Sequence, residues 1–252
     1  MENFDECSKN INETFSCLGN IEKKIHISWK NKDVLDKDYN IIKNGILQLK
    51  NLNPDYEFNI YDNDDIENYL KIKLSHEDYE LIKNKKIVEK TDLWRLFVIY
   101  NEGGIYQDID RFCNIPLSSI IKQTTKCLLP MYYDTDFSQD IMCSSSKNII
   151  YKRAIELNLE RRRGNVSDDI LFFLGPDTYF HAVTEILLGY QLNRNPDKKD
   201  VELLRNLINE SPYLETYREE PPYNTILYQG ENIIFDKGEL YESYGVRFWY
   251  TY

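Results

Sequence analysis

Glycine, proline and histidine are scarce in this chain of 252 residues, which has ten glycines, eight prolines and three histidines. No phosphate-binding loop of the GxGxxG or GxxxxGK[ST] type is present, and neither is the GxSxG turn of serine hydrolases. The histidines are too far apart in the sequence for an HExxH metal site. The sequence therefore lacks the usual signatures of dinucleotide-binding, P-loop and zinc-hydrolase proteins. The three histidines are His26, His76 and His181.

The five cysteines are odd in number and form no CxxC pair, which argues against both a disulfide framework and a zinc ribbon. We expect reduced thiols in a reducing compartment. The first six residues are acidic where a secretory signal would be basic and then apolar. No run approaches the ~20 apolar residues of a membrane span. We therefore expect a cytoplasmic protein of bacterial, viral or effector type with no signal peptide and no transmembrane segment.

Positive charge is also in deficit, because the formal net charge is −11. This acidity argues against nucleic acid as a partner, although a local cationic pocket for a small phosphate ligand is still allowed. The one run of cations, Arg161 to Arg163, falls at the end of a predicted helix. Cations are favourable there, so we expect a solvated helix terminus and not an anion site.

Predicted strands alternate with predicted helices along the chain, which indicates an α/β fold with a mixed, largely parallel sheet flanked by helices. Without internal repeats or a low-complexity linker, residues 1–252 are predicted to form one domain, with residues 1–20 as an N-terminal arm. In such folds ligands bind beyond the carboxyl ends of the strands. The expected strands are 24–29, 56–61, 105–110, 126–131, 140–143, 225–229 and 231–235, and the expected helices are 38–50, 64–72, 87–100, 147–162, 177–191 and 199–209.

The predicted helix over residues 87–100 is apolar around most of its circumference and is therefore expected to be buried. Asp92 and Arg95 nevertheless lie on it, on neighbouring faces. Buried charges are costly unless they are paired with each other or bound to something else. An internal Asp92–Arg95 salt bridge and a ligand-binding pair are both open at this point.

The next predicted strand, residues 105–110, carries Tyr106, Asp108 and Asp110 at alternate positions, which places all three on one face. Two carboxylates side by side at the end of a buried strand repel each other. Either one of them has a raised pKa or both hold a cation. Oxygen ligands of this kind suit Mg²⁺ or Mn²⁺. An exposed Asp-x-Asp turn is the alternative.

The segment from Thr91 to Asp110 resembles the DXD-containing sugar transferases of glycosyltransferase family 32. These include the yeast initiating mannosyltransferase type and, more distantly, the glucosylating clostridial toxins. Their shared pattern is [ST]-D-x-x-R, an apolar run, and then G-G-x-Y-x-D-x-D. This chain supplies the pattern with Thr91, Asp92, Arg95, Gly103, Gly104, Tyr106, Asp108 and Asp110.

Three further segments extend the resemblance to about residues 21–190. Lys24 to Trp29 is similar to the first-strand motif K-x-I-H-x-x-W, and Asn53 to Asp62 is similar to the second-strand motif N-P-x-Y-x-x-x-x-[WY]-D. Leu174-Gly175-Pro176 resembles the T-G-P element.

The resemblance implies a GT-A-like glycosyltransferase that uses Mn²⁺ or Mg²⁺ and a nucleotide-sugar donor, with a UDP-sugar favoured and GDP-mannose as the alternative. It implies transfer to an unidentified glycan, protein or small acceptor, with retention at the anomeric carbon. Residues 21–130 would form the nucleotide-sugar-binding part and residues 131–252 the acceptor-side part.

The resemblance also implies roles for individual residues. Asp110 would bind the metal directly, and Asp108 would contact the metal site, the ribose or the sugar, directly or through water. Asp92 and Arg95 would hold sugar hydroxyls, with Arg95 also near the diphosphate. Two aromatic residues complete the expected donor site: Tyr106 would line it, and Trp29 would stack on the base, with a core position as the alternative for Trp29.

The chain departs from the family pattern at three positions. Gln107 stands where the family usually has an apolar residue, Arg111 where it has Val or Thr, and Leu174 where it has Thr. A C-terminal metal or phosphate contact has only Ser243, Arg247 and Trp249 as candidates. Two other functions stay open. A metal-dependent nucleotidyltransferase also uses paired aspartates, and a degenerate module could bind sugar without turnover.

Overall fold

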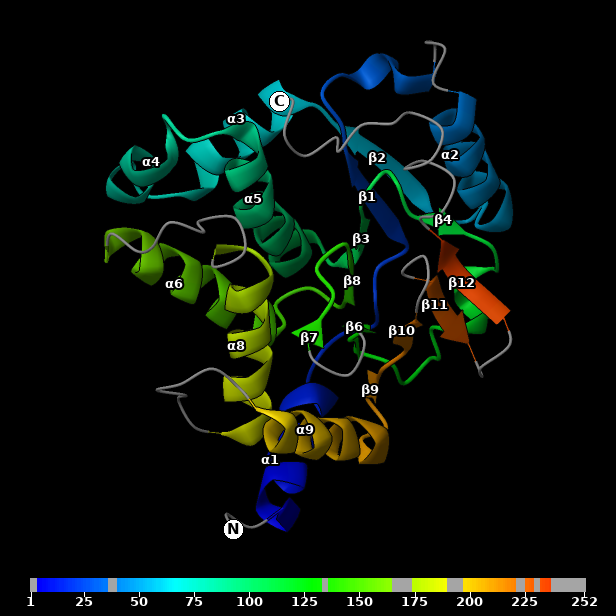
Figure 1. Ribbon diagram of the computed structural model, residues 1–252, viewed down its shortest axis with the longest axis vertical. Helices are drawn as coiled ribbons and strands as arrows, with labels where there is room; N and C mark the ends of the chain where they lie inside the picture. Colours follow the sequence, from blue (N-terminus) through cyan, green and yellow to red (C-terminus); the bar gives the residue numbers. More distant parts are fainter. Residues whose placement is uncertain are drawn as a thin grey trace.

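The computed structural model describes residues 4–35, 40–132, 136–164, 174–189, 197–220, 225–228 and 232–236. Their helices and strands alternate through most of the chain, as the sequence predicts (Figure 1). The helices are α1 Phe4–Ser16, α2 Asn40–Leu52, α3 Asn63–Lys73, α4 His76–Ile82, α5 Ile87–Glu102, α6 Ile149–Arg163, α8 Pro176–Leu188 and α9 Lys198–Glu210. Short 3-10 helices span Lys32–Leu35 and Leu117–Ser119.

The central sheet has six strands in the order β2-β1-β3-β8-β5-β9. Strands β1, β2 and β3 are parallel, β8 is antiparallel to β3 and β5, and β5 is parallel to β9. The expected mixed, mostly parallel sheet is therefore confirmed. The strand bounds are β1 Lys24–Ser28, β2 Glu57–Tyr61, β3 Gly104–Gln107, β5 Cys127–Leu128, β8 Ile141–Ser144 and β9 Leu214–Glu215.

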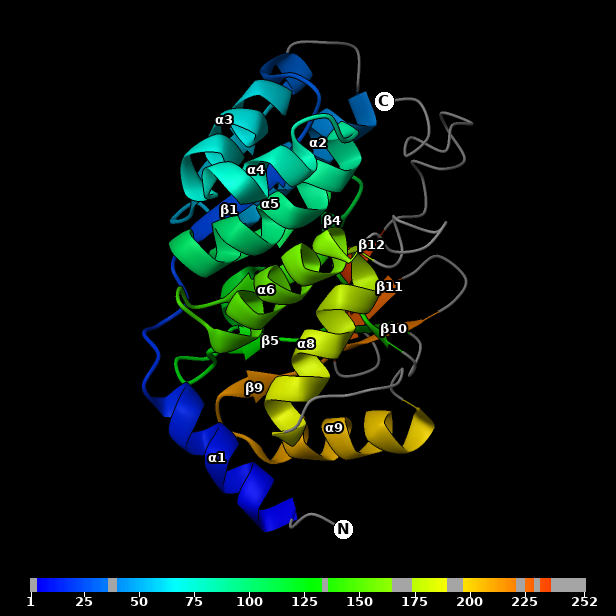
Figure 2. The same cartoon turned by 90° about the vertical axis from the view of Figure 1, so that its left-hand side faces the viewer.

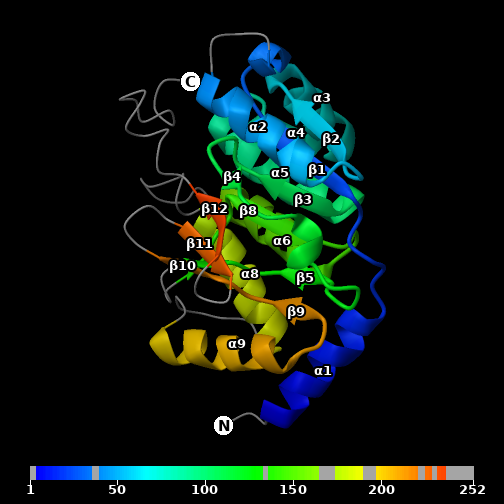
Figure 3. The same ribbon diagram turned by 90° about the vertical axis from the view of Figure 1, so that its right-hand side faces the viewer.

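Helices cover both faces of this sheet, because its strands alternate two apolar sets of side chains. Tyr106 and Met142 belong to the core shared with α5, α6 and α8, on the face seen in Figure 2. Ile105 and Cys143 belong to the core shared with α2, which Figure 3 shows in front of β1. The face that carries Tyr106 therefore lies against α5, the helix that carries Asp92 and Arg95.

A second, smaller sheet has the order β4-β12-β11-β10-β6-β7. Strand β12 pairs with β4 directly after the Asp-x-Asp segment, at Asp236↔Phe112 and Phe235↔Cys113. The expected C-terminal strands are present as β11 and β12, and residues 229 and 231 lie outside the described residues. The strands are β4 Phe112–Cys113, β6 Met131–Tyr132, β7 Asp136–Phe137, β10 Arg218–Glu220, β11 Thr225–Tyr228 and β12 Asn232–Asp236.

Local signals explain where the helices near the parallel strands begin. Asp62 caps α3 and forms a reciprocal capping box with Asp65, so the aspartates after β2 serve the helix. The side chain of Ser75 caps α4 through the backbone N–H of Asp78.

The Gly103–Gly104 pair ends α5 and starts β3, with positive φ angles of 64° and 87°. A Cβ atom at Gly103 would lie 1.8 Å from Glu22 Oε2, and one at Gly104 would lie 2.5 Å from the Lys24 carbonyl oxygen. Only glycine fits this helix-to-strand turn without a shift of the backbone. The turn sets the approach of β3 to β1.

Two expectations about local structure are wrong. Strand β3 ends at Gln107, so Asp108 to Asp110 form a turn beyond the strand and do not share a strand face with Tyr106. The chain leaves the sheet here because Arg111 N donates to Asp108 O at 3.0 Å, closing the turn.

The arginine run at the end of α6 is not the solvated helix terminus expected, except at Arg163, whose side chain is 47% exposed. Arg162 has 3% of its side chain exposed and Arg161 has 12%, and they pair with Glu89 and Asp177. Arg163 pairs with Asp78. The acidic partners come from α4, α5 and α8, which sequence periodicity does not place against α6.

No helix among the described residues is long and apolar enough to span a membrane.

Candidate functional site

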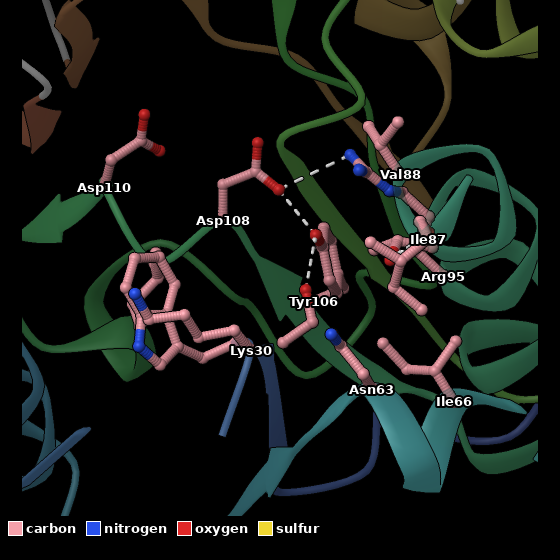
Figure 4. Close-up of a pocket in the computed structure, with 13 residues that line it drawn as sticks. Lys30, Asn63, Ile66, Ile87, Val88, Arg95, Tyr106, Asp108 and Asp110 are labelled. Carbon is pink, nitrogen blue, oxygen red and sulfur yellow. Dashed lines mark hydrogen bonds and ion pairs between the residues drawn. The ribbon is translucent and has the colours of Figure 1, made fainter. Parts of the chain in front are cut away.

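A pocket opens at the carboxyl ends of the parallel strands β1 and β3, the edge expected to hold ligands in this fold class. It encloses about 820 Å³, including its open mouth. Figure 4 shows its lining side chains converging from the end of β1, the start of α3, the first turns of α5 and the end of β3. The lining residues are Ser28, Trp29, Lys30, Asn63, Ile66, Ile87, Val88, Thr91, Arg95, Tyr106, Asp108, Ile109 and Asp110.

Part of the pocket lining is apolar or aromatic, and it comprises Ile66, Ile87, Val88 and the half-buried Trp29. Lys30 Nζ lies 5.6 Å from the centroid of the Trp29 ring. The half-buried Trp29 therefore borders the pocket and also packs against the core on the α2 side of the sheet. An apolar wall with a cation at its rim suits a flat ring attached to an anionic group.

Arg95 is 4% exposed and reaches the pocket from α5. Its Nη2 lies 2.9 Å from Asp92 Oδ1, and its Nη1 lies 3.4 Å from Asp108 Oδ1 and donates to the Gln139 carbonyl oxygen at 3.1 Å. Burial opposes its charge, but Tyr106, Asp108 and Asp92 together raise its pKa above the usual value. Arg95 is therefore a fixed cation that joins the helix to the turn after β3.

Tyr106 connects the sheet to the same carboxylate. Its hydroxyl donates to Asp108 Oδ1 at 2.5 Å, and its ring lies 4.8 Å from Arg95 Cζ. Burial, reinforced by the charge of Asp108, raises the Tyr106 pKa well above its usual value, so the hydroxyl stays protonated and remains a donor. Asp108 thus has its charge offset on the protein side by a phenol and a guanidinium.

Asp110 stands beside Asp108 in the turn, and the two carboxyl groups point to the same side in Figure 4. Both residues are buried, at 7% and 6% exposure, and both line the pocket. Two carboxylates are the protein ligands that Mg²⁺ and Mn²⁺ often use when substrate phosphates and water complete the shell. Within the described ranges no group of three or more His, Cys, Asp or Glu side chains is placed to hold a metal ion by itself. The donor set therefore fits a divalent ion shared with a bound phosphate ligand.

Among the expected site residues that the structure describes, Asp92 alone does not line the pocket. It lies behind Arg95, and burial raises the pKa of its carboxyl group despite the opposing charges of Arg95 and Arg162. The salt bridge considered from the sequence is therefore present, but it is only one part of an array that also includes Asp108.

The structure adds pocket residues that the sequence motifs do not single out, among them Lys30 and Asn63. Lys30 follows β1 closely and Asn63 follows β2, so the rule that ligands bind beyond strand ends could have identified both. Ser243, Arg247 and Trp249 lie outside the described residues.

Comparison with known proteins finds a matching family and similar proteins. Residues 40–126 match a family described as a glycosyltransferase sugar-binding region containing a DXD motif. Inositol phosphoceramide mannosyltransferase 1 of Schizosaccharomyces pombe is 23% identical over 193 residues, which cover 75% of this chain and 58% of the relative. Inositol phosphoceramide mannosyltransferase 3 of the same yeast is 28% identical over 101 residues, 40% of this chain and 27% of the relative. The aligned segments thus span little more than half of the first relative and about a quarter of the second.

A solved structure, the PaToxG glycosyltransferase, superposes with a TM-score of 0.54 at 21% identity, covering 81% of this chain and 83% of that one. This likeness confirms the GT-A type of fold. The family match and the yeast relatives confirm the resemblance to DXD-containing glycosyltransferases, and the matched segment, residues 40–126, includes Asp92, Arg95, Asp108 and Asp110.

Proposed function

We propose that this protein transfers a sugar from a nucleotide-sugar donor to an acceptor with the help of Mn²⁺ or Mg²⁺. The observation that carries the proposal is the pocket in which Asp108, Asp110 and Arg95 meet at the carboxyl ends of β1 and β3. A glycosyltransferase region and a GT-A type of fold agree with this chemistry. A UDP-sugar is the favoured donor, with GDP-mannose as the alternative.

The charges of the pocket suit the cleavage of a sugar–phosphate bond. Negative charge builds up on the leaving diphosphate, and a cation held by Asp110 and Asp108 would supply Lewis-acid stabilisation there. Arg95, with Asp92 behind it, contributes a fixed positive charge that costs no reorganisation during the reaction. In a protein with a net charge of −11, such local cations are needed to hold a polyanionic ligand.

The remaining roles follow from position in the pocket. Trp29 would stack on the base and Tyr106 would orient Asp108, which contacts the ribose or sugar. Asp92 and Arg95 together would hold sugar hydroxyls. All the lining residues fall between Ser28 and Asp110, which supports residues 21–130 as the donor part and leaves 131–252 for the acceptor. The acceptor is a glycan, a protein or a small molecule.

The proposal also includes the stereochemistry of the transfer and the location of the protein. Retention at the anomeric carbon rests on the family resemblance alone. A cytoplasmic location rests on the cysteines, of which Cys17, Cys113, Cys127 and Cys143 are unpaired thiols in the structure.

A panel of nucleotide sugars tests the proposal. We expect the native protein to hydrolyse at least one member slowly with Mn²⁺ and to lose this activity in EDTA. Tight binding of a nucleotide sugar without turnover under any metal condition would indicate a degenerate binding module. Release of pyrophosphate from a nucleoside triphosphate and a sugar phosphate would indicate a nucleotidyltransferase instead.

A further inference from the structure

Two of the positions at which this chain departs from the family pattern, Gln107 and Arg111, flank the Asp-x-Asp turn and are both buried, at 3% and 1% exposure. Neither lines the pocket. These two side chains can therefore influence the site only through the turn that lies between them.

Asp140, which immediately precedes β8, forms hydrogen bonds to residues at both ends of this turn. Its carbonyl oxygen accepts from the backbone N–H of Asp108 at 2.8 Å. Its carboxylate oxygen Oδ2 accepts from Arg111 Nη2 at 2.6 Å and from Arg111 Nε at 3.1 Å. Ser138 Oγ donates to the other carboxylate oxygen. The residue just before the neighbouring strand thus holds both Asp108, the first residue of the turn, and Arg111, the residue after it.

Gln107 closes the same turn from the other direction. Its amide nitrogen donates to the Arg111 carbonyl oxygen at 2.9 Å, across the segment that carries both aspartates. Its amide oxygen is buried and accepts no hydrogen bond within the described part of the chain. A buried acceptor left unsatisfied costs stability. Gln107 therefore does not maximise the stability of the fold, and what its side chain contributes is the hydrogen bond to the turn.

We infer that Gln107, Arg111 and Asp140 form a clamp that fixes the Asp108–Asp110 turn so that both carboxylates face one cation and its phosphate ligand. The inference rests on the proposed function, because it gives the clamp a metal–nucleotide site to position. Gln107 and Arg111 are positioning residues, since they reach the site only through the turn. Side chains that orient metal ligands typically change metal affinity by roughly 10–100-fold when they are replaced.

Gln107→Met is the sharpest test, because it keeps the volume of the side chain, introduces no charge and removes the unsatisfied amide oxygen. We expect an unchanged or slightly higher melting temperature, with Mn²⁺ affinity in the presence of UDP or GDP weakened by roughly tenfold. The amide of Arg111, which donates to Asp108 O, should also exchange faster with solvent in the metal-free protein, since the Arg111 peptide loses the bond from Gln107 that holds its carbonyl oxygen in place.

Two further variants separate positioning from general stability. Gln48→Met is the control for the chemical change alone, because the exposed Gln48 donates through Nε2 to the Cys113 carbonyl oxygen at 3.2 Å and to Asn114 Oδ1 at 2.9 Å, just beyond the turn, and does not line the pocket. It should leave metal affinity unchanged. The double variant Arg111→Met/Asp140→Leu removes both buried charges together, so it avoids stranding one of them. It should fold and should also bind Mn²⁺ more weakly.

The outcomes distinguish this inference from the proposed function. If native protein binds neither nucleotide in a metal-dependent way, the proposed function fails, and with it the positioning role of the clamp. If native protein binds and Gln107→Met binds equally well with equal amide exchange, the clamp is refuted and the proposed function stands. Faster exchange with native metal affinity would show that the clamp only stiffens the turn, which also overturns the inference.

Discussion

Replacing Arg95 with methionine should destabilise the protein more than any other single change in the pocket. The arginine lies 2.9 Å from Asp92 and 3.4 Å from Asp108, and the three residues are 4%, 8% and 6% exposed. Arg95→Met therefore leaves two buried carboxylates without their shared cation. Breaking a buried ion pair costs about 3–5 kcal/mol. At ~2–4 °C per kcal/mol for a chain of this size, the melting temperature should fall by roughly 6–20 °C.

Asp92→Asn should cost less, below about 3 kcal/mol, because Arg95 keeps Asp108 and the Gln139 carbonyl oxygen as partners. The double variant Asp92→Asn/Arg95→Met should recover only part of the loss, since Asp108 remains without its guanidinium. Nucleotide binding should persist in Asp92→Asn, while discrimination among sugar nucleotides is lost.

Urea unfolding of the three variants, with nucleotide affinity measured in parallel, decides between this array and an isolated salt bridge. An isolated pair predicts that the double variant regains native stability and turnover. That result, or equal losses for Asp92→Asn and Arg95→Met, would refute the shared role of Arg95.

Three further predictions concern the base, a buried histidine and the product. Trp29→Ala should weaken donor binding by ~1–3 kcal/mol, and donor should quench Trp29 fluorescence; unchanged affinity in a folded variant would contradict base stacking. Burial lowers the pKa of His26, whose Nε2 donates to the Gly103 carbonyl oxygen at 3.0 Å. The contribution of neutral His26 to stability is therefore complete above the unfolded pKa of about 6.5 and declines as the pH falls toward the lowered folded pKa. Urea unfolding measured from pH 7 to pH 5 should accordingly show a free energy of unfolding that depends less on pH in His26→Gln than in native protein. Finally, NMR of the first-formed product should show the anomeric configuration of an α-linked donor retained, and a β-linked product would contradict retention.

The sequence predicted most of the parallel half of the fold because its signals there are local. Asp62 and Ser75 cap helices where their side chains indicate, and Gly103–Gly104 makes the turn that only glycine permits. The apolar circumference of α5 also matches its burial in the structure. Strand β1 forms where its alternation predicts, although its three central residues are all buried.

The errors arise where long-range contacts decide the structure. The alternation of Tyr106, Asp108 and Asp110 continues past the point where sheet pairing stops, so it gives no sign that β3 ends at Gln107. The turn there is closed by the bond from Arg111 N to Asp108 O and is held by Asp140, which is distant in sequence. Arg161 and Arg162 are likewise buried by acidic partners on other helices, which a window of sequence cannot contain.

The central claim is that Asp110, with Asp108, holds a divalent cation through which nucleotide binds. Calorimetric titration of UDP and GDP into native and Asp110→Ala protein, each with Mn²⁺ and with EDTA, tests it most directly. Native protein should bind one nucleotide only with Mn²⁺, and Asp110→Ala should lose this binding by on the order of 100-fold while its metal-free melting temperature stays level or rises slightly, because one of two neighbouring carboxylates is gone. Metal-dependent nucleotide binding of native strength in Asp110→Ala would contradict the account.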